Sequence, residues 1–312
     1  MKKGKIFTNC LLSVWTLCMA VAFVSCSSDS NDIIDNEIEP VVSSVDARDS
    51  FSMVLKAFSN GKDITVDGEV NNTTLFVFDE NNDFFKQINV DKTYLLEQKQ
   101  IQLECPGSDY ITVIAWSGLS AENEEISALN SSNIISDLQI RLKENNGVVS
   151  ALPGDLFYGQ AKIYGTNPAT KANIQEVKIE RKVAALNLTT TGIIKVYDSK
   201  EGNYFYKVKN AKSAFDHNGN LTGSDVEYVI PASVNEKGEL VSEKTSILAG
   251  STITIELYKD NKMILSSENV KNAETLATTA GKQLNINFNL SRQSYQIYVT
   301  TWGSIVTNVT VG

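Results

Sequence analysis

The chain has 312 residues and a formal net charge of -9, with 42% hydrophobic residues, one histidine and four cysteines. Binding of nucleic acid requires clustered Lys and Arg against the phosphates, and because the sequence holds no such patch, a nucleic-acid partner is excluded. Zinc in proteins is held mainly by Cys and His, so the composition also argues against zinc chemistry, and we expect no metal and no cofactor.

The first 25 residues have the pattern of an export signal. Lys2, Lys3 and Lys5 precede an apolar run from Ile6 to Val24, and a basic head before a short apolar core is typical of such signals. A transmembrane helix is the alternative, but it requires about 20 consecutive apolar residues. Removal of residues 1–25 takes away three lysines and no acidic residue, so the net charge would change from -9 to -12.

The signal ends on a cysteine in a context that suggests lipid attachment. The segment Phe23-Val24-Ser25-Cys26 resembles a bacterial lipobox, with Phe23 where Leu is usual. The resemblance implies cleavage before Cys26 and acylation of that residue, and several acyl chains anchor firmly because each buried CH₂ contributes about 0.8 kcal/mol. The acidic segment Ser27–Asp32 is similar to the surface-export signal of Bacteroidales lipoproteins, which implies display on the outer membrane. We expect residues 26–46 to form an acidic tether.

Strand patterns begin at Phe51. The apolar run Leu75–Phe78 is followed by the turn-rich cluster Asp79–Asp83 and by Phe84-Phe85, which predicts a hairpin. The segment Tyr110–Trp116 is β-branched and aromatic without interruption, which predicts a strand buried on both faces.

The second half of the chain alternates more regularly. In Leu284–Leu290 every even position is apolar and every odd position is Asn, which predicts a strand with one solvated face. Ile253, Ile255 and Leu257 alternate with polar neighbours in the same way. Closely spaced strands with few helical signals predict an all-β fold of sandwiches. We place an N-terminal domain at 47–180 and a C-terminal domain at 181–312.

One turn carries residues that could bind calcium. Between Asp216 and Glu227, acidic and amide side chains occupy loop positions 1, 3, 5 and 12, but position 6 is Leu221 where the sharp turn of a calcium loop has Gly. The Asn218-Gly219 pair suits a tight hairpin in which both central residues have positive φ, and we favour that hairpin, with a solvated His217.

Catalytic patterns are absent from the sequence. A Ser-His-Asp hydrolase would have to use His217, and no G-x-S-x-G motif is present. The paired carboxylates Glu124 and Glu125 lie in a segment that reads as polar surface. We therefore expect a protein that is not an enzyme, with no catalytic residues.

Two tryptophans and the C-terminal segment are further candidates for a binding role. Trp116 and Trp302 could stack on sugars, but burial in a sandwich core is the favoured interpretation. The stretch from Ile297 to Trp302 predicts a last strand, and beyond Gly303 the chain places Ile305, Val309 and Val311 on one face of an extended segment. Such a segment could add to the edge of another sheet, with these three side chains as candidate donor-strand pocket residues.

Several motifs in order resemble one family. They are the segments Leu75–Asn81, Tyr110–Gly118, Leu156–Gly159 and Glu180–Leu186. In this order, behind a lipobox, they are similar to the FimB-type anchor and minor subunits of type V fimbriae of Bacteroidales, a fimbrillin-like family of lipoproteins. Trp302, in the last predicted strand, is more similar to the polymerising fimbrillins.

The resemblance implies two transthyretin-like Greek-key β-sandwich domains in tandem behind a lipoprotein signal peptide. It also implies assembly with other fimbrial subunits by strand exchange. In related stalk subunits an Arg-directed protease removes the leader and first strand, so Arg48 and Asp49 form a candidate processing site. An anchor subunit would instead keep its lipid on Cys26.

The sequence therefore predicts a structural, lipid-anchored subunit of a cell-surface fimbria that supports adhesion. The alternative from a second class is a glycan-binding surface lipoprotein of a polysaccharide-uptake system, and a hydrolase is the third. Anchor, stalk and tip positions all stay open.

Overall fold

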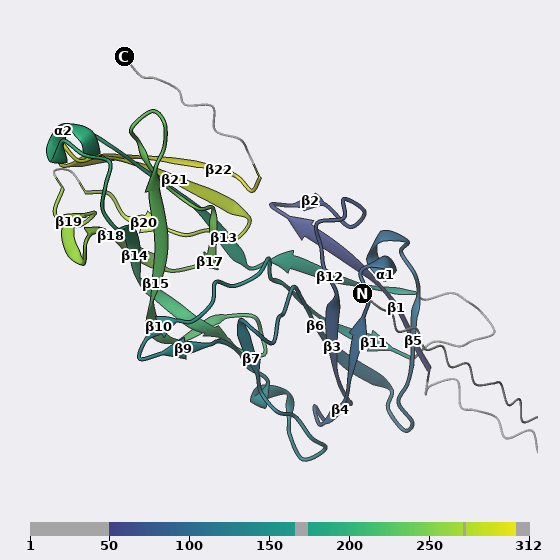
Figure 1. Ribbon diagram of the computed structural model, residues 1–312. Coiled ribbons are helices and arrows are strands. Elements are labelled where there is room, and N and C mark those ends of the chain that lie inside the picture. Colours follow the sequence, from purple (N-terminus) through teal and green to yellow (C-terminus); the bar gives the residue numbers. More distant parts are fainter. Residues whose placement is uncertain (1–49, 166–173, 271–272, 304–312) are drawn as a thin grey trace, which may run out of the picture. The chain divides into compact units, whose positions relative to one another are not determined.

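The structure is a computed structural model that describes residues 50–165, 174–270 and 273–303. It is nearly all-β and contains two sheets (Figure 1). The all-β prediction is confirmed. Within the described residues no helix is long and apolar enough to cross a membrane.

The first sheet is built from the N-terminal half of the chain. Its order is β2-β1-β12-β11-β6-β3-β4, with β5 beside β1, and β1 runs parallel to β12 whereas the other pairs are antiparallel. A short helix, α1, follows β4. The bounds are β1 Ser50–Ser59, β2 Lys62–Asp63, β3 Thr73–Phe78, β4 Phe84–Val90, α1 Thr93–Leu96, β5 Ile101–Glu104, β6 Tyr110–Ser117, β11 Phe157–Tyr164 and β12 Gln175–Arg181.

Two predictions for this sheet are confirmed. Strands β3 and β4 form the expected antiparallel hairpin, and its turn is held by Asp79, whose Oδ1 accepts hydrogen bonds from the backbone N of Asn81 and Asp83, each over 2.9 Å. Strand β6 is buried on both faces: Val113 and Ala115 belong to one apolar cluster, and Ile114 and Trp116 to a second. An uninterrupted apolar strand requires cover on each side, and here both sides have it.

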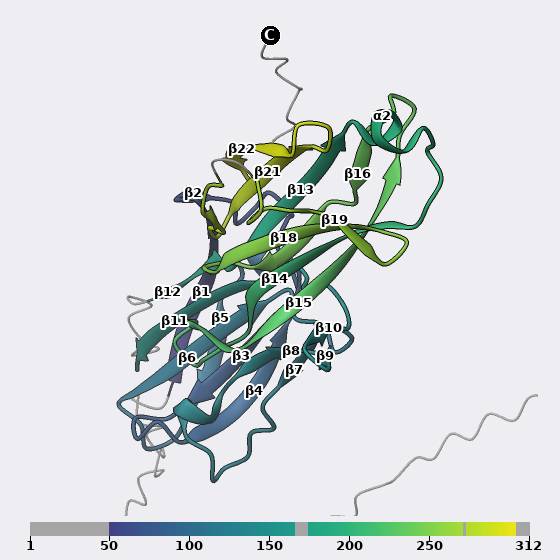
Figure 2. The ribbon, with the colours of Figure 1, turned by 90° about the vertical axis from the view of Figure 1, so that its left-hand side faces the viewer.

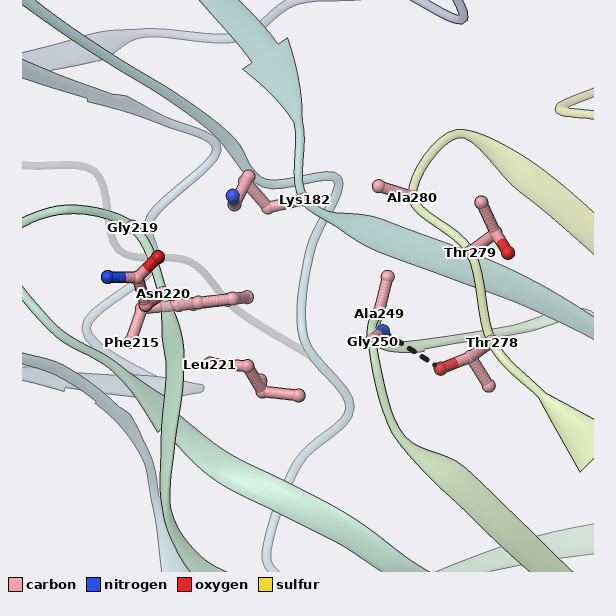
Figure 3. Close-up of a pocket in the computed structure, with 10 residues that line it drawn as sticks. All are labelled: Lys182, Phe215, Gly219, Asn220, Leu221, Ala249, Gly250, Thr278, Thr279 and Ala280. Atoms are coloured by element: carbon pink, nitrogen blue, oxygen red, sulfur yellow. Dashed lines mark hydrogen bonds between the residues drawn. The ribbon is translucent and has the colours of Figure 1, made fainter.

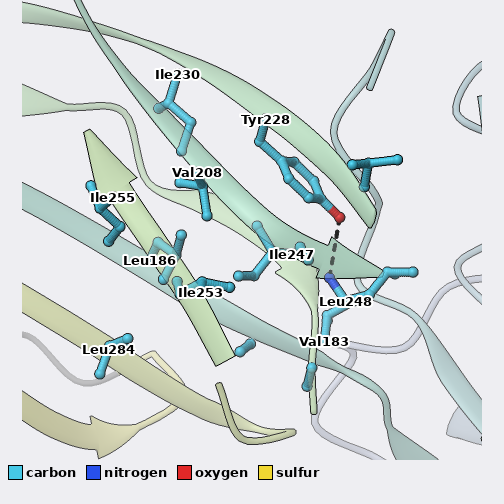
Figure 4. Close-up of a cluster of buried hydrophobic side chains, with 14 of the residues drawn as sticks. Val183, Leu186, Val208, Tyr228, Ile230, Ile247, Leu248, Ile253, Ile255 and Leu284 are labelled. Atoms are coloured by element: carbon cyan, nitrogen blue, oxygen red, sulfur yellow. Dashed lines mark hydrogen bonds between the residues drawn. The ribbon is translucent and has the colours of Figure 1, made fainter. Parts of the chain in front are cut away.

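The second sheet contains strands β7–β10 and β13–β22. Its main path is β19-β18-β14-β15-β16-β13-β21-β22, and its inner face forms the cluster that contains Leu186, Tyr228 and Ile255 (Figure 4). The bounds are β7 Glu124–Ile126, η2 Ile135–Asp137, β8 Ile140–Leu142, β9 Glu144–Asn145, β10 Val148–Val149, β13 Val183–Thr191, α2 Ile193–Tyr197, β14 Tyr204–Phe215, β15 Leu221–Val234, β16 Leu240–Ser242, β17 Thr245–Leu248, β18 Thr252–Lys259, β19 Lys262–Ser266, β20 Leu276–Ala277, β21 Lys282–Asn289 and β22 Ser294–Thr301.

Between β12 and β13 the chain passes from the first sheet to the second within one residue. Lys182 alone separates β12 of the first sheet from β13 of the second. Earlier in the chain, the segment 124–149 also belongs to the second sheet, because β8 pairs with β14 and β10 pairs with β15. The predicted boundary at 180/181 lies next to the change of sheet, but the assignment of 47–180 and 181–312 as domains stays a prediction.

The solvated face predicted for Leu284–Leu290 is partly wrong. The alternation itself is present in β21, with Leu284, Ile286 and Phe288 in the core, but Asn285 is only 2% exposed. β21 lies between β13 and β22, and Asn285 bonds to both neighbours: its Oδ1 accepts from Asn187 Nδ2 over 3.0 Å, and its Nδ2 donates to the Tyr298 carbonyl over 3.1 Å. Polar side chains of adjacent strands cover one another here instead of facing water.

The predicted β14–β15 hairpin is confirmed, with a different turn. Phe215 pairs with Leu221, so the turn has five residues, and of the Asn-Gly pair only Gly219 has positive φ, at 68°. Asp216 stabilises this longer turn, since its Oδ1 accepts from the backbone N of Asn218 over 2.9 Å and of Asn220 over 2.8 Å. Glu227 lies within β15 and pairs with Lys207 over 2.6 Å.

Candidate functional site

The predicted functional residues fall at the two ends of the chain. Cys26, Arg48, Asp49, Ile305, Val309 and Val311 lie outside the described residues. The strands next to these residues are β1, which begins at Ser50 directly after Asp49, and β22, which ends at Thr301. The candidate site is therefore built from the region where the chain leaves β22.

Strand β22 lies at the edge of the second sheet. It pairs with β21 along its whole length, and in the described part of the chain no strand pairs with its other side (Figure 2). Tyr295 and Ile297 pack against the core, whereas Val299 is 59% exposed. The outer edge of a strand presents backbone donors and acceptors that another extended segment can pair with.

Trp302 fixes the point where the chain leaves this strand. Its backbone N donates to the Gly281 carbonyl over 3.0 Å, and its ring stacks on the Arg181 guanidinium, with Cζ 4.4 Å from the ring centroid. Lys244 approaches the same ring at 5.5 Å. Trp302 is half-buried rather than a core residue, while Trp116 is fully buried as predicted.

Arg181 is the buried centre of an ionic cluster with two part-exposed carboxylates, which we call the Arg181 cluster. Its Nε and Nη2 donate to the two carboxylate oxygens of Asp155 over 2.7 and 2.8 Å. Nη2 also donates to Glu69 Oε2, and Nη1 to Ser59 Oγ, each over 2.7 Å. Because these groups come from β1, β12 and two loops, and Trp302 follows β22, the cluster connects the first sheet to the end of the second.

Charge in the Arg181 cluster is largely compensated. Only 2% of the Arg181 side chain is exposed, and its ring contacts are Phe157 on one strand and Trp302. Burial raises the pKa of Asp155, although the Arg181 guanidinium opposes that shift. A cavity of about 290 Å³ lies beside the cluster, lined in part by Asn60, Lys62 and Trp302. The cluster contacts the chain at the point where it leaves β22, through the Trp302 ring.

Glu124 corrects a prediction. The sequence placed it on a polar surface, but it is 3% exposed. Its Oε2 accepts from the backbone N of Ser120 over 2.8 Å, and its Oε1 has no hydrogen-bond partner within the part of the chain that is described. Burial raises the pKa of Glu124. Strand β7 carries it inward because β8, the partner of β7, packs on β14, a pairing that local sequence does not reveal.

His217 contributes a backbone hydrogen bond that stabilises the fold. It is half-buried in the β14–β15 turn, and its backbone carbonyl accepts from the Tyr158 hydroxyl over 2.9 Å. Among the described residues no group of three or more His, Cys, Asp or Glu side chains is arranged to hold a metal ion.

Most of the chain matches the model of one protein family. The family model described as "Fimbrillin-A associated anchor proteins Mfa1 and Mfa2" matches residues 46–308. The major fimbrium anchoring subunit FimB of Porphyromonas gingivalis is 24% identical over 266 residues, which cover 81% of this chain and 85% of FimB.

Solved structures show the same fold. The fimbrial anchor protein Mfa2 from Porphyromonas gingivalis superposes with a TM-score of 0.57 at 13% identity, over 81% of this chain and 97% of Mfa2. A candidate adhesin from Bacteroides ovatus gives a TM-score of 0.62 at 14% identity, over 82% of this chain and 95% of the adhesin.

Proposed function

Because the chain belongs to the family of fimbrillin-A associated anchor proteins Mfa1 and Mfa2, we propose that it is a structural, non-catalytic subunit of a cell-surface fimbria. In this proposal Cys26 carries the lipid that holds the chain in the outer membrane. Residues 26–46 form the tether, and adjoining subunits join by strand addition. The match to the family model along residues 46–308 is the single observation that carries the fimbrial role.

The lipid anchor is supported by the sequence pattern at the start of the chain. A basic head, an apolar run and the Phe23-Val24-Ser25-Cys26 segment occur in the order that lipoprotein export requires. The Cys26→Ala variant should move from the outer-membrane fraction to the soluble fraction after export, while Cys105→Ala should stay in the membrane. Equal membrane retention of both variants would contradict lipid attachment at Cys26.

Strand addition is supported by the outer edge of β22 and by the segment that follows it. Backbone hydrogen bonds along such an edge give affinity, and alternate side chains in pockets give specificity. Ile305, Val309 and Val311 are the proposed pocket residues. Deletion of residues 305–312 should leave the thermal unfolding midpoint unchanged and abolish co-purification with fimbrial partners.

The matched control for that deletion is a variant with Ile305, Val309 and Val311 all changed to Ser, which keeps the backbone length and removes the apolar side chains. If the deletion co-purifies with normal amounts of partner, assembly does not use this segment. If only the deletion fails and the Ser variant assembles, backbone pairing rather than pocket filling carries the contact.

The glycan-binding alternative gains no support from the tryptophans. A sugar platform requires aromatic faces open to solvent, but Trp116 is buried and Trp302 is stacked on Arg181. Retention on an affinity gel of host or plant polysaccharides, lost in the Trp302→Ala variant, is the result that would revive it.

A further inference from the structure

A second cavity lies where the chain changes sheet, on the Lys182 side. It has a volume of about 360 Å³ and is lined by Lys182, by the tip of the β14–β15 hairpin and by the loops that follow β17 and β20 (Figure 3). We call it the Lys182 pocket. Ligand cavities of proteins begin at about this size.

Lys182 lines this pocket, and its ammonium has no carboxylate partner among the described residues. Its ammonium contacts the rings of Tyr158 and Phe215, with Nζ 5.5 and 5.7 Å from the centroids, and no described carboxylate lies within ion-pair distance of it. Two acidic groups, Glu180 and Asp216, oppose the lowering of its pKa by burial. Asp216 is engaged in its own turn, where its carboxylate accepts from Asn218 and Asn220.

Several other partly buried lysines of this protein pair with a carboxylate. Lys207 meets Glu227 at 2.6 Å, Lys209 meets Glu256 at 2.7 Å, and Lys56 meets Glu176. The pKa of Lys209 is raised by that hydrogen bond, whereas burial lowers the pKa of Lys182. An ammonium that loses hydration without gaining a carboxylate is destabilised relative to one that is paired, so the Lys182 pocket offers a favourable place for an incoming anion.

Hydrogen bonds and close packing within the protein hold the lining of the pocket in place. On one side Thr278 Oγ1 accepts from the backbone N of Gly250 over 3.0 Å and of Ser251 over 3.1 Å. On the other side Gly219 packs so tightly on Tyr158 that an added Cβ would lie 2.4 Å from the ring. A preformed cavity reduces the ordering cost of binding.

The remaining lining defines the size and polarity of the ligand. Leu221 and Ala249 supply apolar surface, and Asn220 and Thr279 add polar side chains to the lining. We propose that the Lys182 pocket binds the carboxylate of a ligand with a short apolar body, with the carboxylate on Lys182 Nζ and the apolar body against Leu221 and Ala249. This inference does not depend on the fimbrial role.

The test uses the full-length chain labelled with ¹³C-lysine, in which the Cε signal of Lys182 is assigned by its loss in the Lys182→Arg variant. Propionate is the probe, and propionamide is the uncharged control of the same shape. Propionate should shift the Lys182 signal saturably and raise the pKa of Lys182, because a bound carboxylate favours the charged ammonium. Propionamide should do neither.

Matched variants define the role of the charge. Lys182→Met keeps the apolar stem and should weaken propionate binding by about tenfold or more, the range of one charged hydrogen bond. Lys162→Met removes one exposed positive charge elsewhere and should leave the affinity unchanged. Equal responses to propionate and propionamide, unchanged affinity in Lys182→Met, or no saturation by about 50 mM propionate would each overturn the proposal.

Two sources of the carboxylate are separated by a second pair of probes. N-acetyl-Ala-Ala presents a peptide chain end, and its amidated form lacks the charge. Tighter binding of the free-acid peptide than of propionate identifies a protein chain end as the natural source, and the reverse order identifies a small free acid.

Discussion

Arg181 and Lys182 are neighbours in the chain, yet their surroundings are opposite. The Arg181 guanidinium bonds to Asp155, Glu69 and Ser59 and is covered by two rings. The Lys182 ammonium has ring contacts and a cavity before it. Because successive residues of an extended chain point to opposite sides, one crossing between sheets carries a compensated cation on one side and an uncompensated cation on the other.

We expect the paired cation of Arg181 to contribute to stability and the unpaired cation of Lys182 to contribute to binding. A buried cation with its carboxylates in place contributes to holding elements together, and removing it leaves uncompensated charge. A half-buried cation without a carboxylate contributes little to folding and retains its capacity to bind an anion. Variants of the two residues and of their neighbours test this contrast.

The largest effect should come from Arg181→Met. Loss of the guanidinium leaves the Asp155 carboxylate, which is 22% exposed, without its partner, and we expect a loss of about 3 kcal/mol of the free energy of unfolding, the lower end of the range for breaking a buried ion pair. Urea unfolding followed by tryptophan fluorescence measures it. The double variant Arg181→Met with Asp155→Leu removes both charges and should recover much of the loss. A single variant within about 1 kcal/mol of the parent would show that the cluster is not structural.

A smaller loss is expected from Gly219→Ala, which acts at the wall between the Lys182 pocket and the first sheet. Gly219 has φ of 68°, and a Cβ would overlap the Tyr158 ring, so we expect a loss of about 1–3 kcal/mol. Gly147→Ala is the control, because Gly147 has a similar φ of 78° with open space around it. If both variants lose equally, the hairpin tip does not depend on close contact with Tyr158.

Glu124 extends the contrast to a buried carboxylate without a cation. Its pKa is raised by burial above the ordinary value of 4.5, so the folded state keeps a proton that the unfolded state releases as the pH rises. The stability carried by neutral Glu124 is present at low pH and is lost as the pH rises through the folded pKa.

The Glu124→Gln variant should lack this loss. Relative to the variant, the parent should therefore lose stability as the pH rises above the ordinary value of 4.5 and through the raised pKa of Glu124, which a series of chemical unfolding curves measures. Parallel pH profiles for parent and variant would show that Glu124 is not neutral in the fold.

Lys182→Met should give the smallest effect, within about 0.5 kcal/mol of the parent at pH 7, because no ion pair is lost. Burial lowers the pKa of Lys182 below 10.5, so the unfolded state holds the proton more tightly. The parent should gain stability relative to Lys182→Met as the pH rises through the folded pKa toward 10.5. A loss of several kcal/mol in thermal unfolding would mean that Lys182 belongs to the structural side of the contrast.

The sequence predicts those parts of the fold that depend on neighbouring residues. The two-faced burial of β6 follows from its uninterrupted apolar run, and the β3–β4 and β14–β15 hairpins follow from turn residues between apolar segments. The five-residue turn was missed because Asp216 bonds across it, a choice that the Asn-Gly pair does not show.

Features that depend on distant partners escaped prediction. Arg181 meets Glu69 and Ser59 across 112 and 122 residues of sequence, Asn285 is covered by Asn187 from 98 residues away, and Glu124 is buried because β7 and β8 cross to the second sheet. No local spacing encodes these pairings. The predicted lipid, processing and donor-strand residues stay predictions, because they lie outside the described residues.

The most direct test of the fimbrial anchor proposal is the intact mass of the protein extracted from native outer membranes. We expect a chain that begins at Cys26 and carries the added mass of its acyl chains. A chain that begins at Asp49 without lipid would contradict it, because cleavage after Arg48 would release the protein from its anchor and assign it to the stalk or tip of the fimbria.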